Sequence, residues 1–525
     1  MPVSQTTSRR RGAPLEIPLE LAGRPGPQAL RLQAGLRDAI LAGRLAAGLR
    51  LPSSRDLAAQ LGLGRNAVVA AYEALVGEGL LAADLGAGTF VAARLPRPPA
   101  PPAATDAQAP PNHRACALGV TAAAPDLMAR LAAALRRRTL AAGAADLAYG
   151  DPRGSEALRR EIALHLAASR GIRCDPSCIL IVGGIQQGLR LCAEALMAPG
   201  DPVWFEDPGY PAAWRALTAA GLRPVPVPVD GEGIDVAEGR RRAPAARAAY
   251  VTPSNQFPTG VTLAMERRLA LLDWARAQKA WVLEDDYDNE FRYDGLPLTA
   301  LAGIGGDRVI YCGTFSKSLF AGLRLAYCVV PPAAMGRVVA TREAHDRFPP
   351  VLLEAALAEL MADGTLARHT RRMRSRYRAG RDVLAQALGE AAGDRLALVV
   401  PRQGLHLLAH LPPGTPPGAA ARILALSGIG ARLLGEMRHG APGPEGFVLG
   451  FAGHAPRDLA AAARALGAAI RTVLDGDAPR LDTAAHPLYL SPSGPAGPQD
   501  SDGCDPPCGP NPWLSSSRSS SPWDC

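Results

Sequence analysis

Lysine is the rarest charged residue of this chain, and one lysine lies where covalent chemistry is expected. Of the 57 lysine and arginine residues, only Lys279 and Lys317 are lysines. Arginine stays protonated in proteins, so it cannot supply the nucleophilic amine that lysine can. Lys317 follows an apolar run in RVIYCGTFSKSLFAGLRLAY, whereas Lys279 lies on an amphipathic stretch and is expected to be a solvated helix residue. Lys317 is therefore the candidate for reaction with a carbonyl compound.

Two further segments place polar groups at the ends of predicted strands. The run ILIVGG (179–184) is a strand ending in glycines, and a helix is predicted from about Gln186. A strand, a glycine turn and a helix N-terminus can hold a phosphate, although many α/β units share the pattern. The segment AWVLEDDYDNEFRY (280–293) is an apolar strand that ends in acidic and aromatic residues.

The N-terminal region predicts a helix-turn-helix. Residues 28–43 form an amphipathic helix, with Leu30, Leu36, Ile40 and Leu41 on one face. Ser53, followed by an aspartate three residues later, resembles a capping box and begins a short helix. A glycine turn at 62–64 separates that helix from a second one, which begins near residue 65. Residues 80–92 predict a β-hairpin, or wing, that turns at 86–88.

These elements divide a chain too long for a single core. At about 100–200 residues per domain, 525 residues predict two to four domains. We expect a DNA-binding domain over 25–94, a Pro/Ala linker over 95–113, an α/β domain over 114–475, and a low-complexity, disordered tail over 476–525. The net charge of +8 permits a polyanionic partner.

Several classes of protein are disfavoured. No apolar run approaches the ~18 residues of a membrane helix, and the basic N-terminus lacks the apolar core of a secretory signal. The nine cysteines form no disulfide framework, which favours a cytoplasmic protein with reduced thiols. Cys504 and Cys508 have no second ligand pair, so a zinc- or redox-responsive regulator has little support, and we predict no metal site.

The segment LPSSRDLAAQLGLGRNAVVAAYEALVGEGLL, with GAGTFV after it, resembles the winged helix of the GntR regulators. The resemblance implies that the second helix enters the major groove of an operator, with Arg65 and Asn66 nearest the bases. Arg55, Gly88 and Thr89 would approach the backbone or minor groove. The alternative for each arginine is a solvated surface charge. Gly64 and Ala67 replace the Ser and Thr frequent in the family, which removes two phosphate contacts.

The larger part of the chain resembles a fold-type I aminotransferase domain. YGDPRG, EDPGYP, TPSNQFPTG, EDDYDNEFRY and GTFSKSLFAGLRLAY occur in the order that this family shows. Joined to a GntR winged helix, the match is to the MocR/GabR-type transcriptional regulators, over about residues 25–470. The resemblance implies an α/β fold, a homodimer, the cofactor pyridoxal phosphate (PLP), and an amine or amino-acid effector.

By the same resemblance, Lys317 forms a Schiff base with PLP, Asp285 pairs with the pyridine nitrogen, and Tyr287 reaches the phenolic oxygen. Tyr210 would stack on the ring. The remaining predicted cofactor contacts are Gly184, Ile185, Gln186, Thr314 and Arg324 at the phosphate, Asn255, and Tyr149 at the phosphate of the neighbouring subunit. The alternatives are that Tyr210 and Tyr287 are core aromatics, that Asp285 is a surface acid, and that Gln186, Asn255 and Thr314 are structural turn residues. His406 is expected to be a core histidine.

The chain departs from aminotransferases at the groups that hold a substrate carboxylate. Val448 stands where an arginine is expected, and Ala212 and Ala213 follow the DPGYP tyrosine where some regulators of this type have one. Arg215 or Arg402 could replace the missing arginine in space. Two functions remain open: a regulator that senses PLP or its amine adduct, and a working aminotransferase with a fused DNA-binding module.

Overall fold

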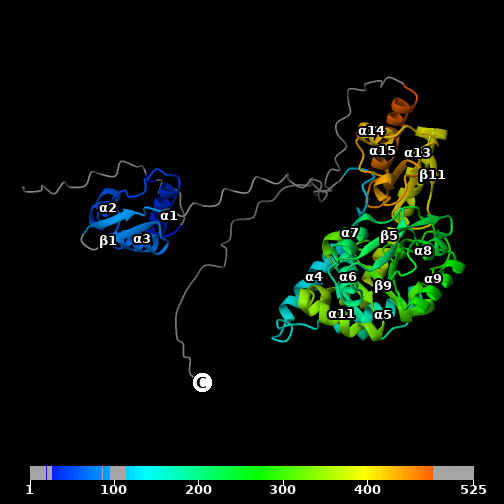
Figure 1. The fold of residues 1–525 in the computed structure, drawn as a ribbon, viewed down its shortest axis with the longest axis horizontal. Coiled ribbons are helices and arrows are strands. Elements are labelled where there is room, and N and C mark those ends of the chain that lie inside the picture. The colour runs from blue at the N-terminus through cyan, green and yellow to red at the C-terminus, as the bar shows by residue number, and fades with distance from the viewer. Residues whose placement is uncertain (1–18, 20–25, 85–86, 95–113, 477–525) are drawn as a thin grey trace, which may run out of the picture. The chain divides into compact units, whose positions relative to one another are not determined.

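The computed structural model describes residues 19, 26–84, 87–94 and 114–476, which form two compact units that divide between residues 110 and 111 (Figure 1). The predicted linker (95–113), and the predicted tail beyond residue 476 with Cys504 and Cys508, lie outside the described residues. The predicted domain boundaries stay predictions. None of the described helices is long and apolar enough to span a membrane.

Over its described residues, the first unit contains three helices and two antiparallel strands. They are α1 (Gln28–Leu41), α2 (Ser54–Leu61), α3 (Arg65–Gly77), β1 (Leu81–Asp84) and β2 (Gly88–Val91). The Ser53 hydroxyl accepts a hydrogen bond from the Asp56 amide at 3.2 Å, which caps α2. Gly62 ends α2 in the left-handed conformation, where glycine carries no steric penalty.

One apolar cluster joins these elements, and one sequence expectation for it was wrong. Leu36 and Ile40 of α1 are fully buried, as predicted, whereas Leu30 is 57% and Leu41 is 42% exposed. Leu32 and Ala39 occupy the inward positions instead. The buried stripe of α1 is therefore rotated away from the two terminal leucines.

The second unit is built on an eight-stranded sheet. Its strands, in spatial order, are β3 (Ile179–Val182), β10 (Ala326–Val329), β9 (Val309–Thr314), β8 (Trp281–Asp285), β7 (Ala248–Val251), β4 (Pro202–Asp207), β5 (Arg223–Asp230) and β6 (Gly233–Ile234). The strands β9, β8, β7, β4 and β5 are parallel, whereas β10 and β6 are antiparallel to their neighbours.

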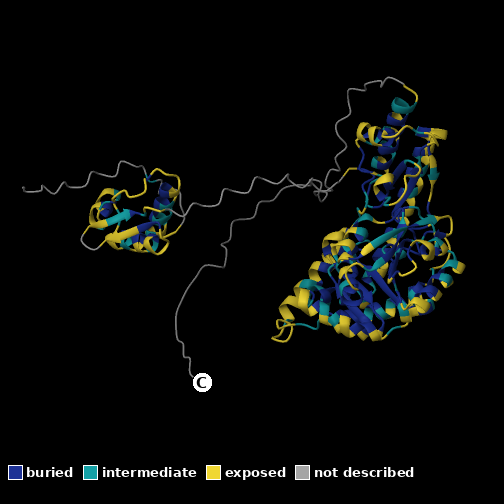
Figure 2. Cartoon of the chain, viewed as in Figure 1, coloured by how far each residue is buried: buried dark blue, intermediate teal, exposed yellow. Residues whose placement is uncertain are grey.

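Helices cover both faces of this sheet, so the central strands are buried throughout (Figure 2). One face packs against α6 (Ile185–Leu196), α7 (Pro211–Ala219) and α11 (Pro332–His345). The other packs against α4 (Pro125–Ala141), α5 (Glu156–Arg170), α8 (Val236–Arg242), α9 (Met265–Gln278), α10 (Leu301–Gly305) and α12 (Val351–Ala362). Burial on both faces explains the continuous apolar runs of the sequence.

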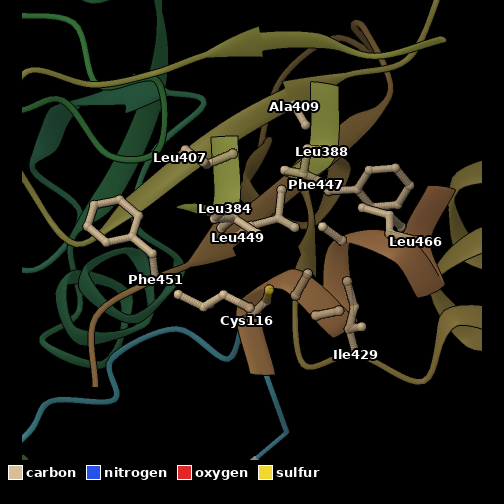
Figure 3. Close-up of a cluster of buried hydrophobic side chains, with 14 of the residues drawn as sticks. Cys116, Leu384, Leu388, Leu407, Ala409, Ile429, Phe447, Leu449, Phe451 and Leu466 are labelled. Carbon is tan, nitrogen blue, oxygen red and sulfur yellow. The ribbon is translucent and has the colours of Figure 1, made fainter. Parts of the chain in front are cut away.

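A smaller lobe completes the second unit. Its antiparallel sheet has the order β11 (Ala397–Val399), β12 (His406–His410), β14 (Gly446–Gly450) and β13 (Arg432–Leu433), and it packs with α13 (Thr365–Ala392), α14 (Ala419–Ser427) and α15 (Pro456–Leu474). Figure 3 shows side chains of α13, α15, β12 and β14 meeting in one cluster, with Cys116 among them. Because the segment after Cys116 continues to Leu118 and Gly119, this packing anchors a chain segment that reaches the cavity described next.

Candidate functional site

A cavity of about 330 Å³ lies at the carboxyl ends of the parallel strands. Open α/β sheets bind ligands at this edge, because strand ends and helix N-termini meet there. Predicted residues that line the cavity are Gly184, Ile185, Gln186, Tyr210, Asp285, Tyr287, Thr314, Lys317 and Arg324. Segments separated by about 140 residues in the sequence thus share one cavity.

Lys317 enters this cavity from the turn that follows β9. A side chain on residue 119 would begin 3.4 Å from Lys317 Nζ, so the backbone at Gly119 covers the amine closely. Burial lowers the pKa of Lys317, while the charges of Asp288 and Asp285 oppose that shift. A lowered pKa leaves more of the amine neutral and nucleophilic. Lys279, in contrast, is exposed at the C-terminal end of α9.

Asp285 ends β8 with one free carboxylate oxygen. Its Oδ2 accepts a hydrogen bond from the Tyr250 hydroxyl at 2.7 Å, whereas Oδ1 is buried without a partner among the described residues. Burial raises the pKa of Asp285 to about 7. Because an unpaired buried carboxylate oxygen is costly, the geometry favours a ligand that brings a donor or positive charge to Oδ1.

The acids beside Asp285 have other partners. Asp286 forms a buried ion pair with Arg170 at 2.7 Å and accepts from the Tyr311 hydroxyl at 2.7 Å. Asp288 accepts from Asn255 Nδ2 at 2.8 Å. Neither of these two carboxylates lines the cavity, in contrast to Asp285.

Asn255 lies just behind the cavity and positions Tyr287. Its Nδ2 lies 3.2 Å from the Tyr287 hydroxyl oxygen, and that hydroxyl also donates to the Asn255 carbonyl at 3.2 Å. Asn255 is buried and does not line the cavity itself. Its contacts therefore hold a tyrosine that does.

The opposite end of the cavity suits an anion. Gly184 precedes α6 and leaves its N-terminus without a side-chain cap, so helix N–H groups are open to a ligand. Gly184 has φ of +149°, and a Cβ there would lie 3.0 Å from the Arg324 guanidinium. The Thr314 hydroxyl oxygen accepts from the Ser316 amide at 3.0 Å, which shapes the turn beside it. Backbone donors and a guanidinium are the groups that bind phosphate.

Aromatic residues form one wall. Tyr210 is 39% exposed, and its ring meets Phe257 edge-on with centroids 5.3 Å apart. His406 packs edge-on against Phe257 at 5.1 Å, and burial lowers the pKa of His406 to about 4. His406 is thus buried, as expected of a core histidine, yet it also lines the cavity.

Several lining residues were not predicted from the sequence to belong to the site. They are Leu118, Gly119, Tyr250, Thr252, Phe257, Ser316, Ala321 and Leu405. Tyr250 and Thr252 lie at the end of β7, next to β8, so the rule that binding residues gather at strand ends could have found them. Leu118 and Gly119 come from far along the chain, and no local pattern marks them.

Tyr149 lies outside the cavity of its own chain. It is 79% exposed, with its ring 5.9 Å from the Phe348 ring and under the guanidinium of Arg347 at 4.8 Å. A large exposed aromatic ring of this kind is available for a contact with another molecule.

Among the described residues, no arginine takes the position of the one expected to hold a substrate carboxylate. Val448 is fully buried against Leu408 and Leu434, and Leu118 packs against the same cluster. Neither Arg215 nor Arg402 lines the cavity. Arg324, at the Gly184 end, is the only arginine among the described residues that line it.

In the first unit, the predicted DNA contacts lie on accessible elements. Arg65 and Asn66 begin α3 and are exposed, as is Arg55 on α2. Gly88 and Thr89 belong to β2 rather than to the preceding turn. A Cβ on Gly88 would lie 3.0 Å from Arg50 Nε, so the Arg50 side chain packs against this strand. Arg50 is therefore a basic residue near the predicted DNA contacts that was not predicted from the sequence.

Comparisons with known proteins agree with this two-part organisation. The pattern of the bacterial regulatory proteins of the gntR family matches residues 28–91, and that of the aminotransferases of class I and II matches residues 118–429. The probable rhizopine catabolism regulatory protein MocR of Rhizobium meliloti is 34% identical over 87% of this chain and 97% of its own length. The chain belongs to the MocR-type transcriptional regulators.

Other relatives place this MocR-type regulator in the same group. The pyridoxine biosynthesis regulator PdxR of Corynebacterium glutamicum is 33% identical over 81% of this chain and 92% of its own length. Among solved structures, the α-aminoadipate aminotransferase LysN of Thermus thermophilus is 28% identical with a TM-score of 0.62, covering 69% of this chain and 93% of LysN. That structure holds N-(5'-phosphopyridoxyl)-L-leucine. The second unit thus has the fold-type I aminotransferase architecture, joined to a GntR winged helix.

Proposed function

We propose that this regulator binds pyridoxal phosphate in the second unit through Lys317, and that the cofactor or its adduct with an amine changes how the winged helix binds an operator. The observation that carries the proposal is the buried, unpartnered Asp285 Oδ1 in the cavity that holds Lys317. A pyridinium N–H is the kind of group that would satisfy this oxygen. We also propose a cytoplasmic location, because the proposed partner is operator DNA.

The residues present fit each part of the cofactor. The phosphate suits Gly184, Ile185 and Gln186 at the start of α6, together with Thr314 and Arg324. Tyr287, held by Asn255, suits the phenolic oxygen, and Tyr210 is placed at the mouth to cover the ring.

When bound, the cofactor supplies an aldehyde for an amine and a ring that accepts electrons. This chain's own groups prepare the site for it. The lowered pKa of Lys317 makes its amine available, and Asp285 holds a proton or a positive charge at the ring nitrogen. The backbone at Gly119 lies close to this amine and covers part of it.

The experiment that tests the proposal measures the absorbance spectrum, the keto-acid product and the operator affinity. Purified protein with PLP is titrated with candidate amines while absorbance and keto-acid product are followed, and operator affinity is measured with and without cofactor. We expect a spectral change without appreciable keto acid, and an operator affinity that depends on the cofactor. Rapid keto-acid formation with an unchanged operator affinity would support the aminotransferase alternative.

A homodimer is the expected assembly. Fold-type I sites use residues from two subunits, and the exposed Tyr149 ring is positioned to serve a neighbour. Two winged helices would then bind a two-part operator more tightly than either one alone. Light scattering of the cofactor-bound protein should give twice the 54.7 kDa chain mass. A monomeric mass with cofactor bound would contradict this assembly.

Arg65→Ala tests the winged helix. Arg65 is exposed at the first position of α3, the position nearest the bases in this fold. Loss of a base contact should weaken binding to the cognate operator by about 1–3 kcal/mol. Gel-shift titration measures the change, with Arg44→Ala, an exposed arginine outside α2, α3 and the strands, as the matched control. Equal operator affinity in both variants would remove Arg65 from the interface.

A further inference from the structure

A second cavity lies behind the turn that carries Lys317. It has a volume of about 350 Å³, within the usual range of small-molecule sites. Within the turn, Ser316 and Lys317 line the first cavity, whereas Phe315 and Ser318 line the second. The four consecutive residues 315–318 therefore contribute two residues to each cavity.

Two buried polar atoms in the second cavity lack partners. Ser318 is 2% exposed, and its hydroxyl makes no hydrogen bond with any described residue. Glu290 likewise has a buried Oε2 without a partner. Burial raises the pKa of Glu290 to about 7. Most buried polar groups are hydrogen-bonded, so two residues that line one cavity and each carry an unpartnered polar atom favour a polar ligand there.

Positive charge lines the wall formed by α13. Arg374 Nε donates to the Glu290 carbonyl at 2.8 Å, and no hydrogen bond of its terminal nitrogens to a described residue is seen. Arg371 is exposed and has no ion pair with any described residue. Both guanidiniums line the cavity. Arginine forks match the two oxygens of a carboxylate.

Most of the cavity surface is apolar, although Glu161 and His165 of α5 also line it. Ile162 of α5, Phe315 of the turn, and Met361 and Leu366 contribute hydrocarbon surface. A ligand for this cavity therefore needs a donor for Glu290, an anionic group for the arginines, and an apolar body between them.

We propose that this second cavity binds a zwitterionic amino acid with an apolar side chain. Its ammonium group pairs with Glu290 and the Ser318 hydroxyl, and its carboxylate pairs with Arg371 and Arg374. The ligand contacts the back of the turn that carries Lys317, and it needs no reaction with the cofactor. The site is thus distinct from the one proposed for pyridoxal phosphate.

The test is calorimetric titration of the full chain with L-leucine. The protein is first saturated with 4′-deoxypyridoxine 5′-phosphate, which fills the first cavity and has no aldehyde to react with an amine. We expect saturable L-leucine binding, and binding at least about tenfold weaker for 4-methylpentanoate, which lacks the ammonium, and for 3-methylbutylamine, which lacks the carboxylate.

Variants locate that binding. Arg371→Ala should weaken L-leucine binding about tenfold, whereas Arg376→Ala, an exposed arginine on the same helix outside the cavity, should leave it unchanged. Ala367→Trp places a large ring at an exposed lining position and should abolish binding without disturbing a buried contact. No heat at millimolar L-leucine, equal binding of the two analogues, or unchanged binding in Arg371→Ala and Ala367→Trp would each overturn the proposal.

Discussion

Lys317→Arg and Lys317→Ala are both expected to lose covalent attachment of pyridoxal phosphate and the yellow colour that goes with it. Arginine keeps the positive charge but supplies no nucleophilic amine, so the two variants should be equivalent in this assay. Both should retain weak, phosphate-driven binding, because Arg324 and the N-terminus of α6 are unchanged. The loss should be complete rather than graded.

The measurement is borohydride reduction followed by peptide mapping. In the natural chain, the reduced cofactor should be found on the peptide that contains Lys317. Lys279→Arg is the matched control, because it removes the only other lysine, which is exposed at the end of α9, and it should not change the labelling. A label on Lys279, or an unchanged label in Lys317→Arg, would show that the site is wrong.

Local sequence patterns predicted most of the helices and strands of the two units. The apolar runs that begin at 179 and 308 predicted strands, and the structure has β3 and β9 there; both are buried along their whole length because helices cover both faces of the sheet. The capping serine and the glycine turn predicted the boundaries of α2 and the start of α3 within a residue. These features are local, so a single sequence contains them.

Contacts between segments that are distant in the sequence could not be predicted from it. The Tyr250 hydroxyl on Asp285 joins two neighbouring parallel strands, and their pairing is decided by the whole sheet. The buried pair of Arg170 with Asp286 explains why one of three nearby carboxylates is not available to a ligand, and α5 carries no pattern that indicates it. The prediction that Leu30 and Leu41 share the buried face of α1 was wrong for a related reason. Helix periodicity predicts an apolar stripe, but it does not show where burial of that stripe begins and ends.

Valine at position 448, where an arginine is expected, should have a large effect on transamination. Transamination needs the substrate held so that a proton can be moved from its α-carbon, and an arginine on the carboxylate commonly supplies that hold. Val448 lies in an apolar cluster with Leu408 and Leu434, and its side chain offers no donor to a carboxylate.

We expect turnover with common amino acids to be slow or absent. Loss of a charged hydrogen bond weakens binding by about 1.5–3 kcal/mol, roughly ten- to a hundredfold, and misorientation of the α-carbon slows the chemical step further. The assay follows keto-acid formation from a panel of amino acids with 2-oxoglutarate, with Lys317→Ala as the background. Typical enzymes turn over at about 1–10³ s⁻¹, so a rate in that range from any ordinary amino acid would establish a working aminotransferase. A rate near the Lys317→Ala background, together with an amine-dependent spectrum, would mean that the site binds its amine without completing the transfer, which is the behaviour a sensor requires.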